Sequence, residues 1–379
     1  MDTSVMITLG FLVFAIVMFA WEKIPLSITA MIVAVGLHLS GVLSAKEAFA
    51  GFVDPNVLLF MGMFVIGEAF FATGVAVGVG NVVHKFAKTE TSLLVAVMMI
   101  TGILSGFLSN TGTAAVLIPV IIGICKKSGF KQTKLLMPLV FAAAMGGNIS
   151  LIGAPGNMIA QAGLQQAGLG SFGFFDYGLV GLPILIVGTI FYATIGKRFL
   201  PDAPSHQPDG AFEGNDDYSH VPSWKKWTAA IVLILTVVAM IFEKQLGVKL
   251  YVSAWIGALV LVATNVISET AAVKSIDMKT IMLFAGSMAL GDAMVKTGTG
   301  SVIADIIVNS LGASPSPIVV LVVIFVLGVF MTNFMSNTAT CALLVPIGLS
   351  LAAQLGLDPK AVLAAIVIAS SLAYATPIG

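Results

Sequence analysis

The chain has 379 residues, of which 58% are hydrophobic and 9% are charged. A typical soluble domain carries about 25% charged residues, and a soluble fold this apolar could not cover its surface with polar groups. The 18 basic residues balance the 18 acidic ones, so no basic surface for a nucleic acid is expected. Composition therefore excludes an ordinary soluble domain and a nucleic-acid-binding protein.

Long apolar runs follow one another from end to end, which predicts an all-α integral membrane protein in the lipid bilayer. A membrane-spanning helix needs about 17–25 apolar residues. The first ten residues lack the positive region of a cleavable signal, so the first run is predicted to be a retained helix. Cys125 and Cys341 lie within runs and are expected to be buried packing residues. The runs cover 5–20, 26–43, 56–83, 91–108, 114–125, 135–147, 177–197, 227–242, 250–267, 280–295, 316–333, 339–353 and 361–375.

A polar stretch from Arg198 to Lys226 divides the chain nearly in half. It holds several acidic residues, several prolines, His206 and His220. Such a composition is typical of a solvated linker. We therefore expect a linker over 198–226 between two membrane halves, 1–197 and 227–379.

Landmarks of the first half recur in the second half in the same order. The offset between matching positions drifts only from 221 to 227 residues, which predicts an internal duplication. The matches are Glu22-Lys23 with Glu243-Lys244, Gly67-Glu68-Ala69 with Gly291-Asp292-Ala293, Ser109-Asn110-Thr111 with Ser336-Asn337-Thr338, Pro119 with Pro346, and Ile152-Gly153 with Ile378-Gly379.

The placement of lysine indicates that the two copies are inverted, because cytoplasmic loops carry an excess of Lys and Arg. Lysines flank the first polar-tipped segment, about 89–125, on both sides. That segment is therefore predicted to be a hairpin that re-enters the cytoplasmic face. The matching hairpin, about 316–353, follows a Ser/Pro-rich stretch and has only Lys360 after it, so it is expected to enter from outside. The lysine-free N-terminus and the loop 161–176 are then also outside.

This threading gives two inverted-topology repeats, the architecture of many secondary transporters. Each repeat is expected to hold three leading helices, a re-entrant hairpin, a broken helix and a final helix. The first broken helix is expected at about 135–160 and the second from 361. The second break begins at Tyr374 and the sequence stops at Gly379, so the C-terminal end is expected to be truncated.

The two hairpin tips place hydroxyl and amide groups between apolar arms. Irregular polar backbone survives at membrane depth only when it is buried or lines a wet cavity. Hydroxyl, amide and carbonyl oxygens suit a dehydrated Na⁺, and the N–H groups of the helices that follow suit an anion. The alternative is a polar helix break that bonds only its own backbone. The tips are Ser105-Gly-Phe-Leu-Ser-Asn-Thr-Gly-Thr113 and Thr332-Asn-Phe-Met-Ser-Asn-Thr-Ala-Thr340.

Two acidic residues, Glu68 and Asp292, occupy matching positions inside apolar runs. An intramembrane carboxylate is a candidate proton or cation site. Both lie near a Thr-Gly pair that can mark a helix end, so a structural role is the alternative. The sequence contains no His-Glu-x-x-His, Gly-x-Ser-x-Gly or P-loop pattern, and no enzyme activity is predicted.

The paired Ser-Asn-Thr motifs, each with a proline ten residues on, and the break Gly153-Ala-Pro-Gly-Asn157 carry a family resemblance. The chain resembles the divalent anion/sodium symporters, the dicarboxylate and sulfate carriers of a wider ion-transporter superfamily. The likeness covers nearly the whole chain. One departure is that the family's break usually reads Thr-Pro-Pro-Asn, where this chain has Ala-Pro-Gly-Asn.

The resemblance implies roles for individual residues. It implies substrate contacts from both motifs and from the break, a first Na⁺ site at the first tip and a second at the other. The implied substrate-binding residues are Ser109, Asn110, Thr111, Ser336, Asn337, Thr338 and Pro155. The implied ligands of the first Na⁺ are Ser105, Ser109, Asn110 and the carbonyl of Gly153, and those of the second are Thr332, Met335, Asn337 and the carbonyl of Gly379.

The resulting prediction is a sodium-coupled importer of a small divalent anion, a C4-dicarboxylate such as succinate, or sulfate. The resemblance also implies an elevator-type motion, a homodimer and the plasma membrane (the bacterial inner membrane) as the location. The alternatives are a Na⁺/H⁺ or arsenite antiporter with Glu68 or Asp292 titrating, a dicarboxylate exchanger, and a channel or membrane subunit that binds partners without a transport cycle.

Overall fold

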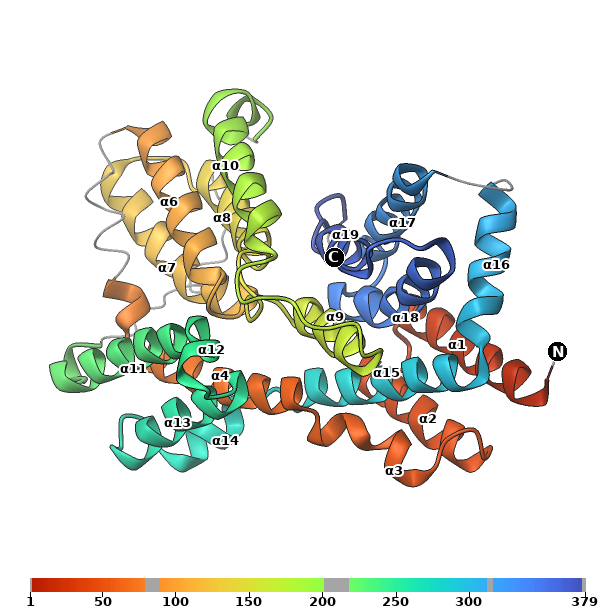
Figure 1. Ribbon diagram of the computed structural model, residues 1–379. Coiled ribbons are helices and arrows are strands. Elements are labelled where there is room, and N and C mark those ends of the chain that lie inside the picture. Colours follow the sequence, from red (N-terminus) through yellow and green to blue (C-terminus); the bar gives the residue numbers. More distant parts are fainter. Residues whose placement is uncertain (1, 79–88, 201–217, 312–315, 377–379) are drawn as a thin grey trace. The chain divides into compact units, whose positions relative to one another are not determined.

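The computed structural model describes residues 2–78, 89–200, 218–311 and 316–376. All regular elements in these ranges are helices, as predicted (Figure 1). Many of them are apolar, and five are both long and apolar enough to cross a membrane. These five are α1 (Thr3–Trp21), α4 (Pro55–Ala72), α11 (Ser223–Ile241), α15 (Met278–Thr297) and α18 (Asn337–Leu355).

The helices form two compact units, and each unit draws helices from both predicted repeats. The first unit comprises residues 1–60, 155–173 and 277–379, and the second comprises 61–154 and 174–276. This division describes packing. The predicted repeat boundaries and the inverted orientation of the repeats remain predictions.

The second unit contains both arms of the first predicted hairpin. These arms are α6 (Glu90–Ser105) and α7 (Asn110–Ser128), and they lie beside α8 (Thr133–Gly146) in Figure 1. Besides most of α4, the other elements of this unit are α10 (Gly178–Thr194), η2 (Gly196–Arg198), η3 (Tyr218–His220), α11, α12 (Glu243–Leu246), α13 (Leu250–Ala263) and α14 (Glu269–Ser275).

The first unit contains both arms of the second predicted hairpin, α17 (Pro317–Thr332) and α18. They pack with each other and with α19 (Pro359–Ser370), which ends shortly before the described chain ends. Besides α1, α15 and the start of α4, the other elements are α2 (Leu26–Leu39), α3 (Ala45–Ala48), η1 (Ala50–Val53), α9 (Pro155–Gln166) and α16 (Thr299–Leu311).

The predicted Thr-Gly helix ends are confirmed, and they shorten one predicted element. Gly74 has φ +75° and Gly298 has φ +73°, left-handed values that favour glycine. Helix α4 therefore ends at Ala72, so the apolar run 56–83 does not form one continuous helix. Residues 79–83 of that run lie outside the described residues.

Three elements of the second unit meet at one end, through polar contacts. Lys134 at the start of α8 lies 3.8 Å from the carboxylate of Glu90 at the start of α6. Lys197, just after α10, donates to the Thr91 hydroxyl at 3.2 Å. The two flanks of the first hairpin and the chain entering the linker are thus at the same end of this unit, and the threading across the membrane stays a prediction.

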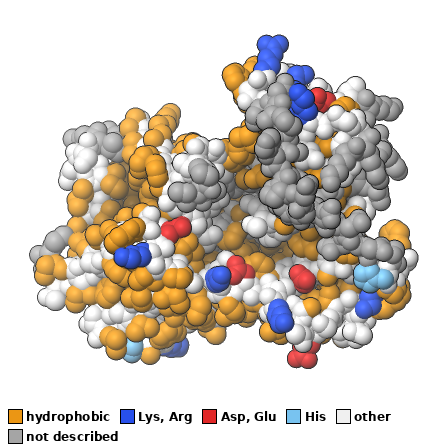
Figure 2. Space-filling view, turned by 180° about the vertical axis from the view of Figure 1, so that it is seen from behind, with side chains coloured by type: hydrophobic (Ala, Val, Ile, Leu, Met, Phe, Trp, Pro, Cys, Tyr) orange, Lys and Arg blue, Asp and Glu red, His pale blue; other side chains and the backbone are white. Residues whose placement is uncertain are grey.

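Large hydrophobic side chains cover much of the exposed surface. In Figure 2 charged side chains are few and scattered among hydrophobic ones. Leu179 on α10 is 79% exposed, and Trp227 on α11 is 69% exposed. A lipid bilayer provides the apolar surroundings that such side chains need.

Candidate functional site

The motif serines begin the second arm of each hairpin. The Ser109 hydroxyl accepts from the Gly112 N–H at 3.1 Å, and Ser336 accepts from Ala339 at 3.2 Å. Each is the N-cap of a 19-residue helix, α7 or α18. The cap fixes where the helix starts and satisfies one of its free N–H groups. These two hydroxyls therefore have a structural role, as the alternative reading of the motif proposed.

Oxygen atoms converge at the first tip, inside the second unit. Ser105 is fully buried at the end of α6, and its hydroxyl lies 2.6 Å from the amide of Asn110 and 2.7 Å from the carbonyl oxygen of Ala143. With its nitrogen turned inward, the Asn110 amide donates to the carbonyl oxygens of Ala143 and Gly153, each at 3.2 Å. Apart from this amide nitrogen, the groups that meet here are a hydroxyl and two carbonyl oxygens.

The helix break after α8 is tied to the first tip. The Ser150 hydroxyl donates to the carbonyl of Gly106. A methyl group on Gly147 would lie 2.6 Å from the side-chain amide of Asn110, so only glycine allows this approach. The break therefore brings the Gly153 carbonyl, one of the predicted ligands of the first Na⁺, to the tip.

The second tip, inside the first unit, repeats these contacts. The Thr332 hydroxyl lies 2.8 Å from the Asn337 amide oxygen and also donates to the carbonyl of Ser370. The Thr376 hydroxyl donates to the carbonyl of Asn333. The first two contacts match those of Ser105 at a shift of 227 residues (332 − 105, 337 − 110 and 370 − 143), the offset of the Ser-Asn-Thr motifs.

The predicted site residues fall into two groups, one at each tip. Of the predicted Na⁺ ligands, Ser105, Asn110 and the Gly153 carbonyl meet at the first tip, and Thr332 and Asn337 meet at the second. At the first tip Thr111 is exposed and at the second Thr338 is partly buried, so both are accessible to a solute. Met335 is buried, and Pro155 belongs to the first unit, whereas Gly153 belongs to the second. Gly379 lies outside the described residues.

Sequence reasoning missed the carbonyl groups of Ala143 and Ser370, which face the tips from α8 and α19. It also missed Asn333, whose side chain accepts from the Ala375 N–H at 3.0 Å and donates to the carbonyl of Val329 at 2.7 Å. Every residue has a carbonyl, so no sequence signal identifies the first two. The repeat alignment could have singled out Asn333, because glycine stands at the matching position 106.

The two candidate carboxylates differ in their surroundings. Glu68 is partly buried on α4 in the second unit. Asp292, on α15 in the first unit, lines a cavity of about 1020 Å³. Among the described residues no three His, Cys, Asp or Glu side chains gather in a way that could hold a metal ion. The two tips offer neutral oxygens instead.

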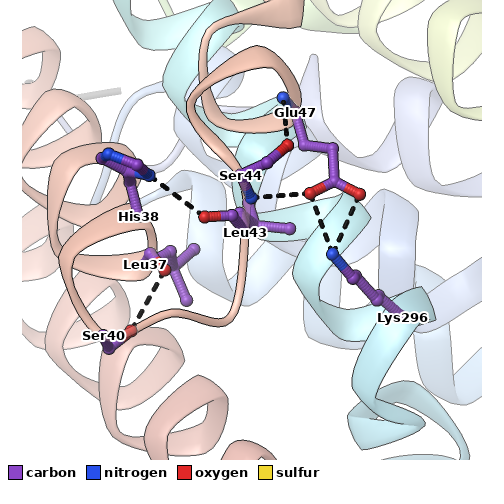
Figure 3. Close-up of polar contacts among 7 residues, drawn as sticks. All are labelled: Leu37, His38, Ser40, Leu43, Ser44, Glu47 and Lys296. Atoms are coloured by element: carbon purple, nitrogen blue, oxygen red, sulfur yellow. Dashed lines mark hydrogen bonds and ion pairs between the residues drawn. The ribbon is translucent and has the colours of Figure 1, made fainter.

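An ion pair lies at the edge of this cavity. Lys296 contacts both carboxylate oxygens of Glu47, at 2.9 and 2.8 Å, and the Ser44 N–H donates to the same carboxylate at 2.7 Å (Figure 3). The hydrogen bond from Lys296, followed by those from Ser44, lowers the pKa of Glu47 from 4.5 to about 2. Nearby, burial raises the pKa of Asp54 despite the N–H groups of Asn56 that it accepts from.

A family model described as a citrate transporter matches residues 16–369. An uncharacterized transporter of Haemophilus influenzae is 28% identical over 390 residues, 98% of this chain and 82% of that protein. The sodium-dependent dicarboxylate transporter SdcS of Staphylococcus saprophyticus is 25% identical over 397 residues, 94% of this chain and 75% of that protein. The uncharacterized transporter YfbS of Escherichia coli is 33% identical over 211 residues, 55% of this chain but only 35% of that relative's length.

A solved structure shares the fold. The YdaH transporter of Alcanivorax borkumensis superimposes with a TM-score of 0.65 over 98% of this chain and 88% of that one, at 16% sequence identity. Identity at this level speaks for the fold alone.

Proposed function

Because the chain belongs to the citrate transporter family, we propose that it carries a small divalent anion across the membrane together with Na⁺. The family and the sodium-dependent dicarboxylate relatives confirm the resemblance to the divalent anion/sodium symporters, which are transporters and not enzymes. Five helices within the described residues are long and apolar enough to span a bilayer, and the protein is a multi-pass membrane protein. The substrate class, the coupling ion and the elevator-type motion belong to the proposal.

The observation that carries the proposal is the oxygen cluster at the first tip. A cation needs several oxygen atoms facing one point, and a hydroxyl, an amide oxygen and two carbonyls are hard ligands of the kind that Na⁺ accepts. Ser105, Asn110, Ala143 and Gly153 supply them. In this structure the amide nitrogen of Asn110 points inward and donates hydrogen bonds to these oxygens, which a cation would otherwise bind. Rotation of that amide would present its oxygen to an entering Na⁺.

The anion is proposed to bind at the exposed side of the same tips. Helices α7 and α18 begin there, and a helix N-terminus attracts negative charge through its free N–H groups. Asn110 and Thr111 start one helix, and Asn337 and Thr338 start the other. A helix start of this kind suits one carboxylate of an anion, and the relatives named as dicarboxylate transporters favour a C4-dicarboxylate, with sulfate as the second candidate.

The test is uptake of labelled succinate by the full-length protein in proteoliposomes, with an inward Na⁺ gradient or with K⁺ in its place. Accumulation above equilibrium only with Na⁺ would support the proposal, and competition by sulfate, malate and citrate would then rank the substrates. Uptake that requires internal dicarboxylate and ignores Na⁺ would identify an exchanger. No succinate flux in any condition would overturn the proposed substrate class.

Asp292→Asn and Glu68→Gln separate this proposal from the antiporter alternative. We expect both variants to retain sodium-driven uptake, because the coupling ion is proposed to bind neutral oxygens at the tips. Loss of all transport in either variant, at normal expression and membrane insertion, would favour an antiporter in which that carboxylate titrates.

A further inference from the structure

A cavity inside the first unit has a lining that contains none of the residues of the two oxygen clusters. Its volume of about 1020 Å³ is at the upper end of small-molecule sites, which span about 300–1,000 Å³. Helices α9, α15, α16 and α18 and the segment around α3 supply the lining. Most of the lining is apolar and includes Ile159, Met288, Val345 and Leu349.

Close helix packing fixes the walls of this cavity. A methyl group on Gly163 of α9 would lie 2.7 Å from Val345 of α18, and one on Gly300 of α16 would overlap the Ser350 hydroxyl of α18. Both approaches need glycine, so α9 and α16 are held firmly against α18. The cavity is therefore formed before any ligand arrives, which lowers the cost of binding.

The described lining of the cavity has two acidic side chains, Glu47 and Asp292, and they differ in whether a basic or hydrogen-bonding group lies next to them. The carboxylate of Glu47 is matched by Lys296 and Ser44, as Figure 3 shows. Among the described residues nothing donates a hydrogen bond to Asp292 or forms an ion pair with it. The charged groups that act on it, Glu47 and Asp54, are both acidic. The Glu47–Lys296 pair is neutral as a whole, so Asp292 leaves the cavity with one uncompensated negative charge.

The residue before Asp292 also lines the cavity and leaves space in it. Gly291 precedes Asp292 on α15, and a methyl group there would meet only Pro346, at 3.4 Å, an ordinary contact distance. A buried charge is stable when it is paired, and an apolar wall favours an apolar neighbour. The cavity thus combines an unpaired carboxylate, which favours a positively charged group, with space and apolar walls for the hydrophobic part of a ligand.

We propose that this cavity binds an organic cation, with the cationic group on Asp292 and an apolar ring or chain against α9 and α18. The amidinium or ammonium group would form a charge-assisted hydrogen bond with the carboxylate. The apolar part would displace water from Ile159, Val345 and Leu349. The proposal goes beyond transport of an anion and does not rest on it. This site is negative and its ligand is positive, whereas the transported anion is proposed to bind at the positive ends of helices.

The experiment measures binding of benzamidine to the purified, full-length protein by calorimetry and by thermal shift. Benzamidine has a planar cation on a phenyl ring, and benzamide is its neutral counterpart of nearly the same shape. We expect saturable benzamidine binding that raises the unfolding temperature, and at least about tenfold weaker binding of benzamide, because a hydrogen bond to a charged group is lost.

Two variants test the assignment to this cavity, and a third is the control. Asp292→Asn removes the charge at constant size, and Gly291→Leu fills the space while keeping the carboxylate. Each is expected to weaken benzamidine binding about tenfold or more. Glu68→Gln changes the matching carboxylate on α4, which does not line the cavity, and should bind like the wild type.

No benzamidine binding by the wild type, equal binding of benzamide, or unchanged binding in both cavity variants would each overturn the proposal. If Asp292→Asn is unstable, Gly291→Leu alone decides it. Because no transport is measured, these outcomes leave the succinate experiment unaffected, and a failure of sodium-driven uptake leaves this inference standing.

Discussion

At the first hairpin tip position 106 is glycine, and at the second tip the matching position 333 is asparagine. A side chain at Gly106 would crowd Ile149 and the carbonyl of Gly146, at 3.1 and 3.3 Å. Asn333 instead uses its amide to hold the chain after α19, through Ala375 and Leu372. Each break is tied to its tip by a hydroxyl, Ser150 to the carbonyl of Gly106 and Thr376 to the carbonyl of Asn333, and only the second break adds a side-chain amide at this position.

The hydroxyl, amide and carbonyl contacts, however, are common to both tips. Ser105 and Thr332 each place a hydroxyl beside an asparagine amide and a carbonyl oxygen. The packing at positions 106 and 333 differs between the copies, whereas this set of oxygens is the same. The comparison therefore separates contacts that hold the fold from contacts available for an ion.

The largest expected effect comes from removing the shared amide. Asn110→Ala and Asn337→Ala should each reduce sodium-driven succinate uptake by about 100-fold or more, since each loses a ligand of both ion and anion. Uptake into proteoliposomes at equal protein content measures this. Wild-type uptake in either variant would remove that tip from the site.

Backbone closure at the first tip should be sensitive to a single methyl group. In Gly146→Ala the new carbon would overlap the backbone of Gly102, so a loss of about 1–3 kcal/mol of unfolding free energy is expected. Thermal unfolding in detergent measures it. The control is Gly123→Ala on α7, where nothing lies within 4 Å and alanine favours the helix. Equal unfolding temperatures for the two variants would contradict the close packing.

Closure at the second tip should depend on the amide of Asn333. Asn333→Ala leaves the Ala375 N–H without its acceptor, and a loss of about 1–3 kcal/mol is expected in the same unfolding assay. Asn309→Ala, at an exposed position on α16, is the matched control and should change little. If both variants unfold at the wild-type temperature, Asn333 does not close this break.

The shared hydroxyls should affect the response to Na⁺ more than stability. Thr332→Val keeps the shape and deletes the hydroxyl, and Ser105→Ala does the same at the first tip. Each should raise the half-saturating Na⁺ concentration for uptake about tenfold, whereas Thr332→Ser, which keeps the hydroxyl, should not. A shift in only one of the two deletions would mean that only that tip binds a coupling ion.

The smallest effect is expected at Glu47, which belongs to neither tip. Its folded pKa of about 2 lies below the ordinary 4.5, so its contribution to stability is present above pH 4.5 and is lost as pH falls toward 2. Glu47→Gln should therefore unfold at a lower temperature than the wild type at neutral pH. The difference should shrink between pH 4.5 and 2. A difference independent of pH would contradict the ion pair with Lys296.

Long apolar runs were enough to predict the all-helical membrane class, whereas the two re-entrant hairpins remain predictions. The tip that holds Ser105 and Asn110 stands out in the sequence because polar backbone at membrane depth must be buried or line a wet cavity, and the family resemblance implied the roles of these two residues. Their carbonyl partner on α8 could not be chosen from sequence, since Ala143 lies 38 residues from Ser105 and looks like any other apolar residue. The cavity at Asp292 also escaped prediction, because it depends on how helices distant in sequence pack together.

Gly153 lies two residues before the point at which the chain passes from the second unit to the first, at Pro155. Its carbonyl faces Asn110, and a methyl group on it would press on the carbonyl of Gly147. The segment at Gly153 that offers a carbonyl oxygen to the proposed ion is therefore also a connection between the two units. Proline at 155 stiffens this connection by fixing one torsion angle. An ion that binds the Gly153 carbonyl would therefore also restrict the motion of the segment that connects the two units.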